Sequence, residues 1–204
     1  MVDATLYYVA DPMCSWCWGF ASTLEKLEAQ LTPDVQLQLV LGGLAPDSDE
    51  PMDDATKAYV QRAWRTVAQA TGAQFNFAFW EQCAPRRSTF PACRAVLAAG
   101  DRGREMFTAI QRAYYLEARN PSDTATLIEL ASELGIPAQP FADRLASDAT
   151  QHVLQSHFHL RDRLQAHGFP ALLLERNHKV TSLAHGFTPL QNLETALRHH
   201  QAIP

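Results

Sequence analysis

A short apolar run that leads directly into two cysteines constrains the fold of this chain more than any other feature. Residues 6–10 read Leu-Tyr-Tyr-Val-Ala, which is typical of a β-strand, and Asp11-Pro12 then interrupts the extended backbone. The next stretch has apolar residues at the spacing of one helix face, at Phe20, Leu24, Leu27 and Leu31. We therefore predict that Cys14 and Cys17 lie in the first turn of a helix that follows a strand.

Two cysteines at this place are suited to thiol–disulfide exchange. Residues three apart on a helix share a face, with Cα atoms about 5 Å apart, which a disulfide allows. The unpaired N–H groups and the dipole of a helix N-terminus favour the thiolate form of a cysteine. We predict that Cys14 is the exposed attacking thiolate and that Cys17, one turn deeper, is the resolving thiol. Half of a zinc site and two inert buried cysteines are the alternatives.

The residues around the cysteines are unusually apolar for the start of a helix. Met13, Trp16 and Trp18 flank or separate the two thiols. Large apolar side chains at an exposed helix start are typical of a surface that contacts another molecule. We predict that these three residues bind the substrate.

Composition and charge exclude several classes of protein. The chain has 204 residues, 47% of them hydrophobic, which is enough for one large domain or one domain with an insertion. A net charge of −5 provides no basic surface for nucleic acid or an anionic membrane. The longest apolar runs, 37–44 and 171–174, are too short to span a bilayer. With no signal-peptide pattern and only four cysteines, we expect a cytoplasmic protein.

The rest of the chain alternates between strand and helix patterns. Residues 35–41 alternate and then become fully apolar, which predicts a second, parallel strand. From 54 to about 135 the patterns are helical, and Gly72 is the expected end of the first of these helices. Phe75, Phe77 and Phe79 are interpreted as a covering loop rather than a strand. The remaining segments are predicted as a helix at 148–167, a hairpin of strands at 171–175 and 179–183, and a helix at 189–199.

The order and four motifs resemble the DsbA-like thioredoxin-fold family. Within it, the chain is most similar to the FrnE-like branch of predicted protein-disulfide isomerases, which is related to the hydroxychromene-carboxylate isomerases. The motifs that carry the resemblance are Asp11-Pro12-Met13-Cys14-Ser15-Trp16-Cys17-Trp18-Gly19, Ser88-Thr89-Phe90-Pro91-Ala92, Asn120-Pro121-Ser122-Asp123 and Gly168-Phe169-Pro170-Ala171.

The resemblance implies an α/β protein with a thioredoxin fold and a large all-helical insertion after the second strand. The expected parts are an N-terminal half of the fold at 1–45, the helical insertion at 46–147 and a C-terminal half at 148–204. The resemblance also makes Pro170 the cis-proline opposite the active site, with Phe169 beside it in substrate binding. A proline just before a strand is tolerated there, because it need not donate to the sheet.

Two positions depart from the family pattern. The periplasmic oxidants of this family have Pro-His between their cysteines, whereas this chain has Ser15-Trp16, so a strongly oxidising character is not expected. Many thioredoxin-fold reductases bury an acid in the first strand, and the matching place here is Tyr8, a poor proton acceptor. Asp11 is the nearest carboxylate, either as a helix cap or as a candidate proton shuttle.

The other reactive residues give weaker signals. Cys83 and Cys93 match no zinc-binding pattern, and Cys93 lies on an apolar helix face, so packing is favoured over a second redox pair. His157 and His159 are two residues apart and do not share a helix face. We therefore predict no metal site.

Three functions fit these observations. The favoured one is a thiol–disulfide oxidoreductase or isomerase that acts on protein or peptide disulfides through Cys14-Ser15-Trp16-Cys17. It needs no bound cofactor, although glutathione is a candidate co-substrate. The second is a glutathione-dependent isomerase or transferase on a small aromatic substrate, and the retention of both cysteines argues against it. The third is a binding module without catalysis that uses the surface of Met13, Trp16 and Trp18.

Overall fold

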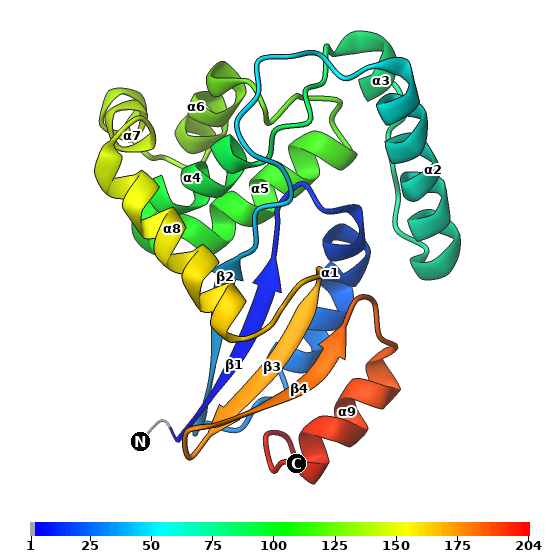
Figure 1. Cartoon of the computed structure of the whole chain (residues 1–204), viewed down its shortest axis with the longest axis vertical. Coiled ribbons are helices and arrows are strands. Elements are labelled where there is room, and N and C mark those ends of the chain that lie inside the picture. The colour runs from blue at the N-terminus through cyan, green and yellow to red at the C-terminus, as the bar shows by residue number, and fades with distance from the viewer. Residues whose placement is uncertain (1–2) are drawn as a thin grey trace.

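The computed structural model describes residues 3–204, and its strands form one mixed sheet (Figure 1). The described strands are β1 (Ala4–Ala10), β2 (Val35–Leu41), β3 (Ala171–Arg176) and β4 (Lys179–His185). Their order across the sheet is β2-β1-β3-β4, with β1 parallel to β2 and antiparallel to β3. β3 and β4 are antiparallel neighbours, so the predicted hairpin is confirmed.

The helices follow the predicted order along the chain. Helix α1 (Ser15–Glu28) connects β1 to β2, and α9 (Leu190–His199) follows β4. The helical part between β2 and β3 consists of α2 (Asp54–Thr71), α3 (Phe79–Gln82), α4 (Phe90–Ala98), the 3₁₀ turn η1 (Gly100–Arg102), α5 (Gly103–Tyr115), α6 (Thr124–Glu133), α7 (Ala138–Leu145) and α8 (Asp148–Arg163). Within residues 3–204, no helix combines the length and the apolar character that a bilayer crossing requires.

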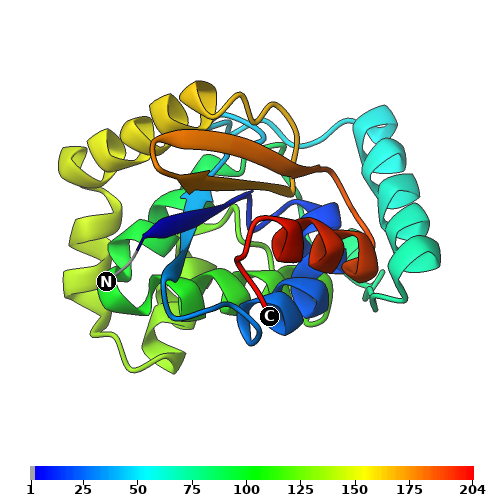
Figure 2. The same ribbon diagram turned by 90° about the horizontal axis from the view of Figure 1, so that it is seen from below.

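The two faces of the sheet are covered by different helices. Side chains alternate along a strand, so Leu6 and Tyr8 of β1 join the large core that contains α1 and α9. Val9, from the same strand, joins a smaller cluster with Leu164, just after α8. Figure 2 shows α1 and α9 on one side of the sheet and α8 on the other. Helix α1, called the cysteine helix below because Cys14 and Cys17 lie at its start, is therefore held by the main core.

Local signals explain where the first helix of the insertion begins and ends. The side chain of Asp53 accepts a hydrogen bond of 2.6 Å from the backbone N–H of Thr56, which caps the start of α2. Gly72 ends α2 in the left-handed conformation, with φ of 75°, which glycine adopts at low cost. The prediction that Gly72 stops this helix is confirmed.

Some predicted boundaries are wrong by several residues. The first helix ends at Glu28, so Leu31 lies beyond it rather than on its face. The helix predicted to reach residue 167 ends at Arg163, because the chain turns there toward β3. The loop interpretation of Phe75 and Phe77 is confirmed, but Phe79 begins the short helix α3. These differences arise where tertiary packing decides the end of an element.

His157 connects α8 to the edge of the sheet and provides a test by pH. Its Nδ1 accepts a hydrogen bond of 3.0 Å from the backbone N–H of Leu41 in β2, and burial lowers its pKa. A lowered pKa favours the neutral ring in the folded state. The contribution of His157 to the free energy of unfolding is therefore fully present above the pKa of about 6.5 that a histidine has in the unfolded chain. It is lost as the pH falls below that value, because the unfolded chain then binds the proton more readily.

We expect acidification to weaken the native protein more than a variant without this histidine. Between neutral pH and about pH 5.5, the free energy of unfolding should fall more for the native protein than for His157→Gln. Urea unfolding followed by circular dichroism measures this difference. His159→Gln, an exposed histidine on the same helix, should keep the native pH dependence. Parallel pH profiles for the native protein and His157→Gln would contradict this assignment.

Candidate active site

The two cysteines lie where β1 passes into α1, but they are more deeply placed than predicted. Cys14 is the N-cap residue of α1, with extended backbone, and Cys17 is in the first turn. The side chain of Cys17 is fully buried, and only 6% of Cys14 is exposed. The prediction that Cys14 is exposed is therefore wrong, although it remains the more accessible of the two thiols. Both are present as free thiols.

The loop before β3 covers Cys14. The Phe169–Pro170 peptide bond is cis, as the family resemblance implies. The backbone oxygen of Phe169 lies 3.7 Å from Cys14 Sγ, within reach of the thiol as a donor. Gly42 allows this loop to approach, because a Cβ atom at position 42 would lie 2.2 Å from the Phe169 ring. The covering of Cys14 thus depends on a glycine at the end of β2.

Burial separates the two thiols chemically. Burial raises the pKa of Cys17 well above its usual value, and the neighbouring Cys14 side chain raises it further. Tyr8 of β1 lies on the same side, and its pKa is raised by burial and then by Cys17 and Cys14. Tyr8 is thus the buried polar group next to Cys17, at the place where a carboxylate was expected in related reductases. Cys17 is therefore held in its protonated form near neutral pH.

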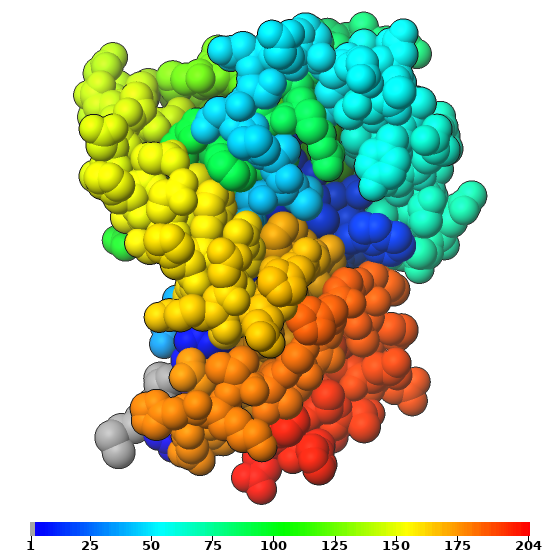
Figure 3. Space-filling view, viewed as in Figure 1, coloured from blue at the N-terminus to red at the C-terminus, as the bar shows by residue number. Residues whose placement is uncertain are grey.

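The aromatic and apolar residues of the motif have different surroundings. Met13 is buried, so the prediction of an exposed surface made by Met13, Trp16 and Trp18 is wrong for this residue. Trp16 is partly exposed, and its ring lies 6.0 Å from that of Phe187, in the loop after β4. Trp18 stacks on Tyr115 of α5 at 5.6 Å, which ties α1 to the helical part. In Figure 3, blue atoms from the first part of the chain reach the surface between cyan and orange segments.

Asp11 is buried, and its carboxylate connects three segments of the chain instead of capping helix α1. Its carboxylate accepts hydrogen bonds from the backbone N–H of Met13 at 2.7 Å and of Leu44 at 2.8 Å. The Thr89 hydroxyl donates at 2.7 Å, and Cys93 Sγ lies 3.6 Å away. Burial raises the pKa of Asp11, while these hydrogen bonds lower it. Asp11 therefore holds the segment before Cys14 against the loop after β2 and the start of α4.

The roles predicted for Asp11 and the other cysteines have different outcomes. In residues 3–204, no hydrogen bond joins the Asp11 carboxylate to Cys14 or Cys17, so proton transfer by Asp11 stays a prediction. Cys93 is buried, as predicted, and contacts Asp11. Cys83 is partly exposed and its thiol lies 3.1 Å from the backbone oxygen of Ala118.

The sequence did not assign roles to three residues that shape this site. Phe187 reaches Trp16 from the end of β4, Thr89 binds Asp11 from the insertion, and Gly42 lies under Phe169. Thr89 lies in one of the family motifs and Gly42 in a Gly-Gly pair, but neither signal shows which distant residue it meets. Within residues 3–204, no group of three or more His, Cys, Asp or Glu side chains is placed to hold a metal ion.

Comparisons with solved structures agree with this geometry. The proposed protein disulfide isomerase of Nitrosomonas europaea is 30% identical, with a TM-score of 0.86 over 98% of both chains. The cytosolic disulfide reductase DsbM of Pseudomonas aeruginosa is also 30% identical, with a TM-score of 0.76 over 97% of this chain and 98% of that one. The same reductase has also been solved with GSH, at 28% identity and a TM-score of 0.75 over the same shares of the two chains.

A curated protein and a family model also match this chain. The ClpXP adapter protein SpxH of Bacillus subtilis is 24% identical over 156 residues, which cover 74% of this chain. This chain matches only 51% of the length of that relative. The model of the DSBA-like thioredoxin domain matches residues 5–198, which include the cysteine helix, the helical part and the strand hairpin. The chain therefore belongs to the DSBA-like thioredoxin domain family.

Proposed function

We propose that this protein is a thiol–disulfide oxidoreductase that acts on protein or peptide disulfides through Cys14 and Cys17. The observation that carries the proposal is the unequal burial of two free thiols at the start of α1. Cys14 retains some access and lies beside the Phe169–Pro170 loop, whereas Cys17 is fully covered and has a raised pKa. This arrangement suits Cys14 for attack on a substrate disulfide and Cys17 for the later attack on the mixed disulfide.

The proposed reaction moves two electrons from the protein to the substrate. The Cys14 thiolate attacks one sulfur of the substrate disulfide, which forms a mixed disulfide and releases the other sulfur as a thiolate that takes up a proton. Cys17 then loses its proton and attacks Cys14 Sγ. This step forms the Cys14–Cys17 disulfide and releases the reduced substrate. Because Cys17 is buried, it attacks only a sulfur already joined to Cys14.

Substrate contacts are proposed for the aromatic residues near the two cysteines and for the Phe169–Pro170 loop. Trp16 and Phe187 form a partly exposed aromatic pair, and the backbone oxygen of Phe169, next to Pro170, lies beside Cys14. Aromatic side chains bury a large apolar area at low entropic cost, which favours binding to apolar peptide segments. Trp18 is assigned a supporting role, because its ring stacks on Tyr115 and its indole N–H donates to the Gln74 oxygen at 2.9 Å.

Glutathione is the proposed electron donor that returns the Cys14–Cys17 disulfide to two thiols. Support comes from the similarity to DsbM, a cytosolic disulfide reductase that has been solved with GSH. Two glutathione molecules supply the two electrons and are released as one oxidised dimer. The similarity also supports a reducing, cytoplasmic setting for the protein.

A coupled assay tests this function against the glutathione-dependent isomerase alternative. The protein is mixed with a peptide that has one internal disulfide, glutathione, glutathione reductase and NADPH. We expect protein-dependent NADPH consumption that saturates with peptide concentration. A parallel assay with a hydroxychromene carboxylate and glutathione should show no isomerisation. Isomerisation of the aromatic compound without reduction of the peptide would replace the proposal by the alternative.

A further inference from the structure

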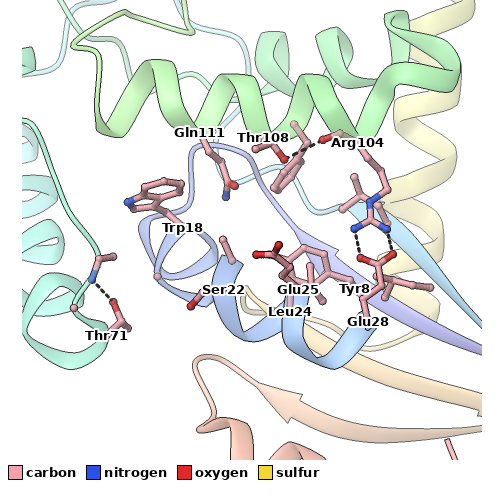
Figure 4. Close-up of a pocket in the computed structure, with 17 residues that line it drawn as sticks. Tyr8, Trp18, Ser22, Leu24, Glu25, Glu28, Thr71, Arg104, Thr108 and Gln111 are labelled. Atoms are coloured by element: carbon pink, nitrogen blue, oxygen red, sulfur yellow. Dashed lines mark hydrogen bonds and ion pairs between the residues drawn. The ribbon is translucent and has the colours of Figure 1, made fainter. Parts of the chain in front are cut away.

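A cleft lies between α1 and α5, apart from the two cysteines. It has a volume of about 540 Å³, within the range of small-molecule sites. Neither cysteine, nor Phe169 or Pro170, belongs to its lining. Figure 4 shows Trp18 at one end and the paired Arg104 and Glu28 at the other. The cleft is thus a separate site on the far part of the cysteine helix.

One buried polar group in the lining of this cleft is a hydrogen-bond donor without a partner within residues 3–204. Gln111 of α5 is only 3% exposed, and its Nε2 makes no hydrogen bond within residues 3–204. Figure 4 shows its side chain pointing from α5 into the cleft toward α1. Buried polar groups are nearly always paired, so an unpaired amide aimed into a cavity indicates a ligand with an acceptor oxygen.

The opposite wall provides a negative charge. Glu25 of α1 lines the cleft, and Figure 4 shows its carboxylate on the same side as the end of Gln111. No ion pair within residues 3–204 uses Glu25, whereas the neighbouring Glu28 is held by Arg104, with one hydrogen bond of 2.7 Å. The free carboxylate is therefore suited to bind a positively charged amine.

The rest of the lining is largely apolar, with Ser22, Thr71 and Thr108 as further polar residues. The floor and sides of the cleft are formed by Leu24, Leu37, Leu39, Phe107 and the Trp18 ring. Trp18 and Glu25 are seven positions apart, which corresponds to about 10 Å along a helix. Two extended peptide residues span about 7 Å, so a dipeptide with apolar side chains matches this length.

We propose that this cleft binds the free amino terminus of a short apolar peptide. The α-amino group pairs with Glu25, the first peptide carbonyl accepts from Gln111 Nε2, and the apolar side chains pack on Phe107 and Leu24. The site is independent of the cysteines, since none of the proposed contacts involves sulfur.

Calorimetry with the dipeptide leucyl-phenylalanine tests the proposal, because this probe has neither thiol nor disulfide. We expect saturable binding that Glu25→Gln weakens about tenfold, the loss typical of a hydrogen bond to a charged group. Gln111→Leu should weaken binding about fivefold without lowering the melting temperature, because leucine leaves no unpaired donor. N-acetylated leucyl-phenylalanine should bind the native protein as weakly as the free dipeptide binds Glu25→Gln.

Two controls make the outcome decisive. Lys26→Gln changes a charge on an exposed part of the same helix, outside the lining of the cleft, and should bind the dipeptide as the native protein does. Circular dichroism confirms that each variant is folded before binding is compared. No saturable binding by the native protein would overturn the proposal. Equal binding by the native protein, Glu25→Gln and Gln111→Leu would also overturn it.

Discussion

Replacing Cys14 by serine is expected to lower the rate of disulfide reduction at least about a thousandfold, to the background of the assay. A serine hydroxyl remains protonated at neutral pH and does not form a mixed disulfide. Cys17 does not replace the lost nucleophile, because it is fully buried and its pKa is raised. The coupled assay with glutathione and a disulfide peptide measures this loss.

A second cysteine provides the matched control for this substitution. Cys83→Ser makes the same chemical change at a partly exposed cysteine outside the proposed reaction and should keep the native rate. Native activity in Cys14→Ser would refute the proposed nucleophile. Complete loss of disulfide reduction in Cys83→Ser would show that replacing a cysteine by serine abolishes activity without removing the attacking thiol.

Replacing Trp64 by alanine is expected to cause the largest loss of stability, about 3–5 kcal/mol in the free energy of unfolding. Trp64 is fully buried in α2 and lies at the centre of an aromatic cluster. The centroid of its ring lies 5.0–5.8 Å from those of Phe75, Phe77, Phe79, Trp80, Tyr114 and Tyr115. Alanine would leave a cavity that so many rings cannot fill by small movements.

Urea unfolding compares this variant with Tyr59→Ala, a substitution in the same helix at a side chain that is 60% exposed. We expect Tyr59→Ala to change the free energy of unfolding by no more than about 0.5 kcal/mol. The effect of Trp64→Ala should also reach the cysteine helix, because Tyr115 touches both Trp64 and Trp18. A loss below about 1 kcal/mol would show that the cluster does not hold the helical part together.

Local patterns were sufficient to place the cysteines and the sheet. The apolar run, Asp11-Pro12 and the helix spacing after it located Cys14 and Cys17 at the junction of β1 and α1. The hairpin and the stop at Gly72 also followed from short-range signals. These features depend on residues close together in the chain, which is why the sequence alone predicted them.

Burial at the site depends on distant segments and was not predicted. Cys14 is covered because Phe169 reaches it from a position 155 residues later in the chain. Asp11 is enclosed because Thr89 arrives from the helical insertion. Neither contact has a local signature, so an exposed thiol and a helix cap were the natural expectations. The same reason explains why Phe187 received no role before the fold was known.

The departures from the family pattern bear on the direction of electron flow. Ser15-Trp16 supplies no positive charge between the two cysteines, and Tyr8 rather than a carboxylate lies beside Cys17. In strong oxidants the reduced form of the cysteine pair is strongly stabilised. The reduced Cys14 and Cys17 pair lacks such stabilisation by a neighbouring cation. This chemistry is consistent with the proposed reduction of substrate disulfides at the expense of glutathione.

The most direct test of the proposed function is to identify what becomes attached to Cys14 when the second step is blocked. Cys17→Ser is expressed in cells, the lysate is quenched with acid, and adducts on Cys14 are identified by mass spectrometry. We expect proteins or peptides in disulfide linkage to Cys14, and none in the Cys14→Ser/Cys17→Ser double variant. Glutathione as the only adduct, or no adduct at all, would contradict a protein or peptide disulfide substrate.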